Sequence, residues 1–311
     1  MTYNVENLFD TQDDPQKSDE TFLPYEKKES KEHIQKCNRI DKKSWREECL
    51  FLNWSDEAVH QKMSQLARVI QSVSGSGPDI LVLQEVENVQ VLKLWVQKYL
   101  QTSNYQTIVL LEGDDLRGID VAVVSRFPLS RKPTLHPIPF TKMNQQIKYD
   151  TRGILEVHLQ AEDREITVYA NHFPAPFHPH TFREQAFDYL RSLQKANSNP
   201  YQIAAGDFNV PASENQKVHM LENHVLPSWE ALHLQCHGCK GTQYYPPEKS
   251  WSFLDMILIS KEASWKVVPD SIQVVQKHWM LNEDQTPRSF QVRTGNGVSD
   301  HLPLYAEIEF L

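Results

Sequence analysis

The stretch ILVLQEV, residues 80–86, is a short apolar run that carries one carboxylate, Glu85, near its end. An apolar run of this length predicts a buried β-strand. A carboxylate set in such a run costs free energy unless it is paired or bound to a metal. The stretch therefore predicts a strand and, at the end of that strand, a polar site.

The same combination of an apolar run and a polar side chain recurs along the chain. After the opening strand TYNVENLFD (2–10), further strands are expected at YQTIVLLE (105–112), IDVAVVSR (119–126), GILEVHLQ (153–160), EITVYANHF (165–173), QIAAGDFN (202–209), FLDMILIS (253–260) and PLYAEIEF (303–310). Several of these runs alternate apolar and polar residues, as half-buried strands do.

Helical patterns fill the gaps between the strands. One apolar stripe consists of Val59, Met63, Leu66, Ala67 and Ile70. Ser55 precedes this stripe as a plausible N-cap. Further helices are expected within 88–100 and 181–196. Strands interspersed with helices predict α/β layers around β-sheets, although the pattern alone does not choose between one parallel sheet and a sandwich.

Residues 11–53 are polar, charged and weakly periodic, and we interpret them as an insertion or a long loop. They contain Cys37 and Cys49, and the remaining cysteines are Cys236 and Cys239. Two local disulfides are the first expectation, with a four-thiolate zinc site or free thiols as alternatives. Disulfides would indicate an oxidising compartment.

Composition limits the class of protein. The chain has 311 residues with 40% hydrophobic and 23% charged residues, which is typical of a globular protein. The net charge of −9 argues against a generic basic nucleic-acid binder but not against a phosphate substrate held through a metal. No apolar run approaches the roughly 20 residues that span a bilayer. Because the chain opens directly on a strand, we expect that a segment such as a signal peptide was removed, which favours a secreted or periplasmic protein over a cytoplasmic one.

Eight polar residues lie in or beside the predicted strands. They are Asn4, Glu85, His172, Asp207, Asn209, Asp255, Asp300 and His301. Each has an ordinary structural interpretation: a solvated strand end for Glu85, an Asx turn for Asp207 and Asn209, and a buried structural imidazole for His172. Asp255 inside an apolar run needs a partner. Eight independent accidents of this kind are a poorer explanation than one shared site.

Asp300 and His301 adjoin the last predicted strand. Neighbouring residues on a regular strand point to opposite faces. Glycines before this pair and Pro303 after it predict an irregular lead-in, in which both side chains are free to face one site.

Three further polar residues are weaker candidates for the same site. Arg117 and Arg152 are candidates for bidentate phosphate contacts, with a structural salt bridge as the alternative. Asp120 is either a supporting group of the site or a satisfied polar residue at the start of a strand.

Together the motifs resemble the endonuclease/exonuclease/phosphatase superfamily, which includes deoxyribonuclease I, exonuclease III and bacterial sphingomyelinases. The resemblance covers residues 1–311 and follows the family's order of motifs. It rests on TYNVENLFD, DILVLQEVEN, RGIDVAVVSRFPL, ANHF, AAGDFNVP, FLDMIL and VSDHLPL. It implies a single catalytic domain over 1–311, built as a two-sheet α/β sandwich flanked by helices in four layers, α/β/β/α. Nothing carries over to the segment at about 11–53.

The resemblance also implies a divalent metal, Mg²⁺ or Mn²⁺, bound by Glu85 with Asn4 and Asp300 as supporting ligands. Magnesium prefers oxygen ligands and keeps several waters, so one or two carboxylates suffice. The metal would offset charge that develops on the phosphoryl oxygens.

The remaining five residues are implied to be catalytic. His301 resembles the general base, oriented by Asp255. Asp207 and Asn209 resemble the pair that positions the nucleophile and the leaving group, and His172 resembles a donor to the scissile phosphate. In this arrangement water attacks in line, and positioning and electrostatics supply most of the catalysis.

The expected function is hydrolysis of a phosphodiester, with an endo- or exonuclease as the first hypothesis. A phospholipid, sphingomyelin or inositol-phosphate hydrolase is the alternative within the same chemistry. A catalytically inactive scaffold is disfavoured, because all eight expected positions are filled. We expect a monomer whose partner is a phosphoester, with nucleic acid as the favoured substrate.

Overall fold

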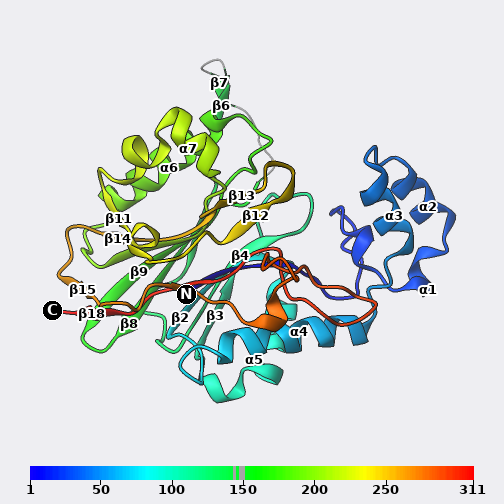
Figure 1. Cartoon of the computed structure of the whole chain (residues 1–311), viewed down its shortest axis with the longest axis horizontal. Coiled ribbons are helices and arrows are strands. Elements are labelled where there is room, and N and C mark those ends of the chain that lie inside the picture. Colours follow the sequence, from blue (N-terminus) through cyan, green and yellow to red (C-terminus); the bar gives the residue numbers. More distant parts are fainter. Residues whose placement is uncertain (143–144, 147–150) are drawn as a thin grey trace.

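Two six-stranded β-sheets pack face to face between helices in a computed structural model that describes residues 1–142, 145–146 and 151–311 (Figure 1). In the view of Figure 1, α4 and α5 lie below the sheets and α6 and α7 lie above them. The expected fold class, a two-sheet α/β sandwich flanked by helices, is confirmed.

The first sheet has the order β16-β17-β1-β2-β4-β3. Its strands are β1 (Thr2–Leu8), β2 (Ile80–Val86), β3 (Thr107–Leu110), β4 (Asp120–Ser125), β16 (Gln273–Val274) and β17 (Leu304–Tyr305). The parallel pair β1–β2 lies at the centre, and the other pairs are antiparallel.

The second sheet has the order β11-β14-β10-β9-β8-β5. Its strands are β5 (Thr134–His136), β8 (Ile154–Ala161), β9 (Arg164–His172), β10 (Gln202–Asp207), β11 (Trp229–Ala231) and β14 (Asp255–Ser260). Here β9 and β10 are parallel, and β10 and β14 are antiparallel. Short pairs outside the two sheets are β6 (Thr141–Lys142) with β7 (Gln145–Gln146), β12 (Gln243–Tyr245) with β13 (Ser250–Ser252), and β15 (Trp265–Val267) with β18 (Ile308–Phe310).

Alternation along β2 explains how the layers assemble. Leu81 and Leu83 join the cluster beneath α4 (Asp56–Gln71) and α5 (Val89–Tyr99), whereas Val82 joins the core between the two sheets. Successive side chains of a strand point to opposite faces, so a run that is apolar throughout can fill both layers. A third cluster packs α6 (His180–Ala196) against the outer face of the second sheet.

The helices α4, α5 and α6 form where the sequence predicts them, whereas α7 and the helices α1, α2 and α3 within the expected insertion or long loop were not predicted. The side chain of Ser55 accepts a hydrogen bond from the Ala58 N–H and caps α4. The Asn88 side chain caps α5 in the same way. The other helical elements are α1 (Tyr25–Lys28), α2 (Lys31–Asn38), α3 (Lys43–Phe51), α7 (Ala212–Val218), the π-helix η3 (Leu221–Val225) and the 3₁₀ turns η1 (Glu20–Phe22), η2 (Gln101–Ser103), η4 (Leu232–Gln235), η5 (Pro246–Glu248) and η6 (His278–Met280). Among the described residues, no helix is long and apolar enough to cross a bilayer.

The prediction of one final strand over 303–310 was wrong, because the chain divides there into β17 and β18. Glu307 lies between them, and its backbone turns away from the first sheet. Its N–H donates to the Ser271 hydroxyl at 3.0 Å and its carbonyl accepts from Val268 at 2.9 Å. Alternating apolar residues predicted the strand pattern, but these partners from outside the run redirect the chain.

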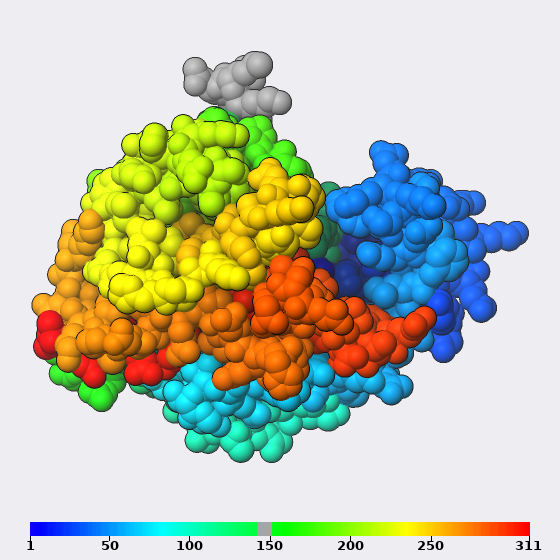
Figure 2. Space-filling model, viewed as in Figure 1, coloured from blue at the N-terminus to red at the C-terminus, as the bar shows by residue number. Residues whose placement is uncertain are grey.

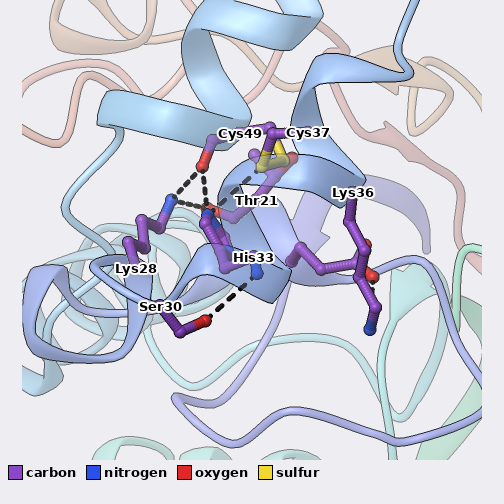
Figure 3. Close-up of a disulfide and its surroundings, with 8 residues drawn as sticks. Thr21, Lys28, Ser30, His33, Lys36, Cys37 and Cys49 are labelled. Carbon is purple, nitrogen blue, oxygen red and sulfur yellow. Dashed lines mark hydrogen bonds and ion pairs between the residues drawn. A yellow bond between two sulfur atoms is a disulfide. The ribbon is translucent and has the colours of Figure 1, made fainter.

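Residues 11–53 form a helical lobe that projects from the body of the molecule (Figure 2). Cys37 on α2 and Cys49 on α3 are joined by a disulfide, as expected (Figure 3). Two side chains pack beside it: Lys28 donates to the carbonyls of Thr21 and Cys49, and His33 contacts the Cys49 carbonyl. The disulfide links two helices that bury little else, since α2 buries His33 and Cys37 and α3 buries Cys49.

Cys236 and Cys239 form the second disulfide, so both local pairs are present and no described cysteine remains free for a zinc site. Two disulfides are compatible with an extracellular location.

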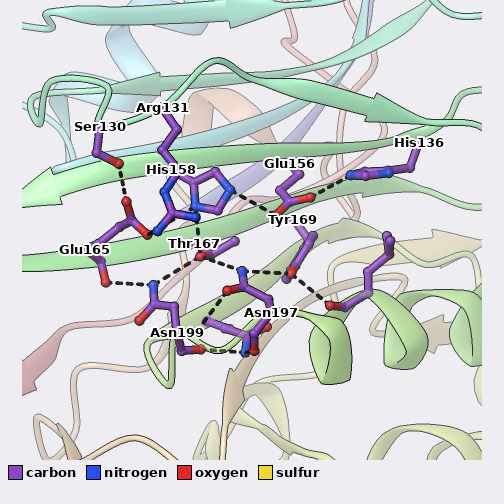
Figure 4. Close-up of polar contacts among 12 residues, drawn as sticks. Ser130, Arg131, His136, Glu156, His158, Glu165, Thr167, Tyr169, Asn197 and Asn199 are labelled. Atoms are coloured by element: carbon purple, nitrogen blue, oxygen red, sulfur yellow. Dashed lines mark hydrogen bonds and ion pairs between the residues drawn. The ribbon is translucent and has the colours of Figure 1, made fainter.

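A polar cluster on the second sheet surrounds Glu156 of β8 (Figure 4). Its carboxylate contacts His136 Nε2 at 2.6 Å and His158 Nε2 at 2.9 Å. His158 also lies 3.4 Å from Glu165, which pairs with Arg131. Hydrogen bonds from the two histidines lower the pKa of Glu156 to about 2.

The Glu156→Gln substitution should therefore destabilise the protein at neutral pH. A carboxyl whose folded-state pKa is depressed contributes stability above its unfolded pKa of about 4.5 and loses it as the pH falls toward 2. Because the carboxylate is partly solvated, we expect a loss of about 1 kcal/mol at pH 7. Urea unfolding at pH 7 and pH 3 measures this loss, and the difference from wild type should shrink at the lower pH. An equal difference at both pH values would contradict the assignment.

Candidate active site

The eight residues expected at one site come from both sheets, and Asn4 links two of them across the sheets. Its amide Nδ2 donates to Asp207 Oδ2 at 3.1 Å and to Glu85 Oε1 at 3.4 Å. Asp207 ends β10 of the second sheet, while Asn4 and Glu85 lie on β1 and β2 of the first. A single buried amide therefore bridges the two sheets.

Glu85 reaches this bridge because its strand is irregular. The register of β2 with β4 shifts between Gln84 and Val86, and Glu85 has φ 64°. A bulge of this kind redirects a side chain that regular alternation would aim elsewhere. A left-handed conformation costs a non-glycine residue about 1 kcal/mol, so the surrounding structure has to hold it.

Asp207 is almost completely buried and contacts several of the other candidates. Its Oδ1 accepts from the Asn209 N–H at 2.9 Å. Its Oδ2 lies 3.6 Å from His172 Nε2 and 4.0 Å from His301 Nε2. The Asn209 side chain donates to the Phe173 carbonyl at 3.0 Å, which fixes the loop after β10.

His301 is paired with Asp255 through Nδ1 and Oδ2 at 2.7 Å. Asp255 is fully buried, and its backbone N–H donates to Thr242. Burial opposes a charge on His301, but Asp255, Asp300 and Asp207 prevail and raise its pKa well above the usual range. Since Nδ1 is held by Asp255, Nε2 is the nitrogen that faces Asp207.

The other buried groups shift in different directions. Burial raises the pKa of Asp207 to about 7, with the charge of His301 opposing and that of Asp255 adding to the shift. Burial lowers the pKa of His172 well below its usual range, and the charges of Arg152, Arg117 and His301 lower it further. His172 is therefore neutral at pH 7, unlike His301.

Asp300 lies on a bend before β17, as the irregular lead-in predicted. Unlike His301, it is exposed, and it lines a cavity of about 340 Å³ together with Tyr244 and Arg288. Asp300 and His301 also act on each other electrostatically. Ser299 holds the segment by donating to the Asn4 carbonyl at 2.7 Å and accepting from the His301 N–H at 3.0 Å.

The three weaker candidates differ in their surroundings. Arg117 Nη2 donates to Asn7 at 2.8 Å and lies 3.8 Å from Glu85 Oε2. Arg152 instead forms a buried ion pair with Asp115 at 2.5 Å, which is the structural alternative. Asp120 starts β4 and accepts from the Gly113 N–H.

Metal-ligating atoms are close together in this cluster. One ligand atom each from Asp207, Asp255 and His301 lie within 4.8 Å of one another. The His301–Asp255 hydrogen bond occupies two of these groups. Glu85 and Asp300 lie outside this group and carry carboxylate oxygens of the kind that hard divalent cations prefer. The donor set therefore fits such a cation, while Asn4 presents its nitrogen to the carboxylates and uses Oδ1 to accept from the Glu6 N–H.

Sequence reasoning missed Glu6 and Lys62. Glu6 accepts from the Phe290 N–H, and burial followed by the charge of Asp300 raises its pKa to about 8. Lys62 is fully buried on α4, and burial lowers its pKa to about 8 against the charges of Glu6, Asp300 and Glu85. The position of Lys62 was a usable signal, since it falls within the apolar stripe between Val59 and Leu66.

The two-sheet α/β sandwich is the architecture of a family of phosphoester hydrolases. The chain belongs to the Endonuclease/Exonuclease/phosphatase family, whose pattern it matches over residues 1–46 and 48–310. Comparison with curated proteins gives no match.

Solved structures share the fold at low sequence identity. An endonuclease/exonuclease/phosphatase family protein from Bacteroides thetaiotaomicron is 17% identical, with a TM-score of 0.55 over 81% of this chain and 90% of that chain. Truncated Caenorhabditis elegans TDP2 is 14% identical, with a TM-score of 0.52 over 82% of this chain and 92% of that chain. D. rerio TDP2, complexed with a single-strand DNA product, is 16% identical, with a TM-score of 0.51 over 80% of this chain and 92% of that chain.

Gly206, next to Asp207, provides a test of how closely the strands approach at the site. It has φ +148°, and a Cβ there would lie 2.0 Å from the Asn171 carbonyl oxygen. Gly206→Ala should therefore destabilise the protein by at least about 2 kcal/mol, measured by urea unfolding.

Gly75→Ala is the matched control. Gly75 has φ +73° but nothing within 4 Å of its Cβ position, so only conformational strain of about 1 kcal/mol is expected. Equal losses in the two variants would mean that the contact with Asn171 is unimportant.

Proposed function

We propose that this protein is a divalent-metal-dependent phosphodiesterase that cleaves nucleic acid by in-line attack of water. The observation that carries the proposal is the buried pair of His301 and Asp255, in which His301 Nε2 faces Asp207. Asn4 in turn connects Asp207 to Glu85. A structural cluster would not need a neutral and a charged histidine beside the same carboxylate. Acid–base and phosphate-binding chemistry uses both.

His301 is the proposed general base. Asp255 holds Nδ1 and so fixes the orientation of the ring, and Nε2 accepts a proton from the attacking water once His301 has lost its own proton. The carboxylates that raise its pKa also increase its affinity for that proton. Asp207, which His301 Nε2 faces, orients the water together with Asn209.

His172 has a different proposed role. Its depressed pKa keeps the imidazole neutral, so it can donate a hydrogen bond to a phosphate oxygen without carrying a charge into the buried site. The distance of 3.6 Å between His172 Nε2 and Asp207 Oδ2 supports a position of this donor beside the proposed water. The distinct environments of His172 and His301 separate the two tasks.

Glu85, Asn4 and Asp300 are the residues that would hold Mg²⁺ or Mn²⁺. When bound, the cation offsets the charge that develops on the phosphoryl oxygens. At present the Asn4 amide directs Nδ2 to the carboxylates of Glu85 and Asp207. Rotation of the amide would direct Oδ1 there instead, where it could bind a cation held between them. The bulge at Glu85 keeps that carboxylate aimed at the same place.

Nucleic acid is favoured as the substrate by two observations. The similar D. rerio TDP2 was solved with a single-strand DNA product. In this chain the polar cavity of about 340 Å³ beside Asp300 has Arg288 and Tyr244 in its lining, a cation and an aromatic ring suited to a nucleotide next to the scissile phosphate.

We further propose that residues 1–311 act as one monomeric catalytic domain with an insertion at about 11–53, in a secreted or periplasmic location.

The test is an assay of the purified protein on plasmid DNA, single-stranded DNA, RNA, sphingomyelin and inositol phosphates, with Mg²⁺, Mn²⁺ or EDTA. Metal-dependent cleavage of a nucleic acid is expected. Hydrolysis of sphingomyelin or inositol phosphate alone would move the proposal to the alternative substrates. Inactivity on every substrate with both metals would overturn it.

Replacing Glu85 with Gln should abolish turnover and weaken metal binding, because one negative oxygen ligand is lost while the shape is kept. Titration calorimetry with Mn²⁺ and thermal unfolding measure binding and fold separately. Wild-type rates in a folded variant would remove Glu85 from the metal site.

His301→Ala should lower kcat at least about a hundredfold at saturating metal, because the proton acceptor is lost. The wild-type rate should rise with pH through an apparent pKa above 6.5, since a base acts only when deprotonated. This rise of the rate with pH should be absent from the residual activity of the variant. A loss of only a few-fold would make His301 a structural residue.

A further inference from the structure

The ammonium group of Lys62 lies in an environment that the fold alone does not explain. Its side chain is fully buried on the inner face of α4, and Nζ donates to the Val298 carbonyl. Among the described residues, no carboxylate forms an ion pair with it within 4.0 Å. A buried cation costs several kcal/mol unless other charges compensate it. A methionine side chain would fill the space of the lysine's methylene groups without the free-energy cost of burying a charge.

The compensating charges are Glu6, whose N–H donates to Asn4, and two of the proposed metal ligands, Asp300 and Glu85. Glu6 acts most strongly on Lys62, followed by Asp300 and Glu85. These carboxylates repel one another, and the acidic group is concentrated at one end of the sheets. The geometry agrees, because Lys62 Nζ lies 5.3 Å from the centre of the Phe290 ring and the Phe290 N–H donates to the Glu6 carboxylate.

Lys62 is also connected to the catalytic segment. Val298, its hydrogen-bond acceptor, directly precedes Ser299, which holds both Asn4 and His301. Gln65, one turn along α4, donates to the Gly295 carbonyl at 3.1 Å. The helix therefore supports the lead-in to β17 at two points.

We propose that Lys62 is a built-in counter-charge that stabilises the site before a divalent cation binds. This inference deepens the proposed function and rests on its metal site. A cation that enters the site takes over part of the compensation, so Lys62 and the metal oppose each other electrostatically. A purely structural lysine would lower stability equally with and without metal when it is removed.

The proposal predicts that Lys62→Met binds Mn²⁺ at least about threefold more tightly than wild type, because one repelling positive charge is gone. Without metal the variant should unfold at a lower temperature, and saturating Mn²⁺ should raise its midpoint by more than it raises that of wild type. Titration calorimetry and thermal unfolding measure both effects without any activity assay. Unchanged or weaker affinity in Lys62→Met would overturn the proposal.

Two variants control this experiment. Lys62→Arg keeps the charge and should retain wild-type affinity even if packing suffers. Arg68→Met removes a positive charge from the same helix where the guanidinium stacks on Trp279, away from the acidic end, and should leave affinity unchanged. Tightening of equal size in Arg68→Met would attribute the effect to net charge and overturn the proposal.

A metal-free double-mutant cycle separates this inference from the proposed function. Lys62→Met and Glu6→Gln should be less destabilising together than the sum of the single losses, because each removes the partner of the other. Additive losses would overturn the counter-charge role. Coupling in the cycle together with no Mn²⁺ binding by wild type would instead refute the metal site and leave the charge pairing intact.

Discussion

The hydrogen bonds of Asn4 are the constraint on which the rest of the site depends. One buried amide contacts Glu85 from its own sheet and Asp207 from the other. The faces between the sheets are filled with aliphatic residues, so a polar group there must find its partners locally. The site occurs where the apolar interface stops and the ends of β1, β2, β10 and β14 meet. Its geometry is therefore set by how the sheets pack.

Local strain is concentrated at the same place. Glu6, Asn7, Glu85 and Asn209 all have positive φ values, and each adjoins or belongs to the cluster. Such conformations persist only when the surrounding structure determines them. Here the supports are visible: hydrogen bonds from Asn4 to Glu85, from the Asn209 N–H to Asp207, and a central pair of parallel strands. The regular sandwich stabilises a backbone that would be unfavourable on its own.

Much of this arrangement could be predicted from the sequence, and the exceptions have physical reasons. Polar residues at the ends of apolar strands indicated the shared site, because parallel strands bring their ends to one edge. Lys62 escaped notice because helical periodicity identifies which face is buried, not which buried residue is charged. The division of the last strand at Glu307 depends on Ser271 and Val268, partners that no local pattern reveals. Asp300 was correctly placed on an irregular segment, but its exposure depends on the cavity formed with the β12–β13 region.

The balance of charge explains why so acidic a site can exist in a folded protein. Buried carboxylates favour folding only if cations or hydrogen bonds compensate them. His301 compensates Asp255 and Asp207, while Lys62 interacts electrostatically with Glu6, Asp300 and Glu85. The first cation is held by a hydrogen bond to its carboxylate, whereas the second is held by a backbone carbonyl and acts at a distance. Arg117 adds a third cation at 3.8 Å from Glu85 Oε2, so each part of the acidic cluster is balanced by a different kind of contact.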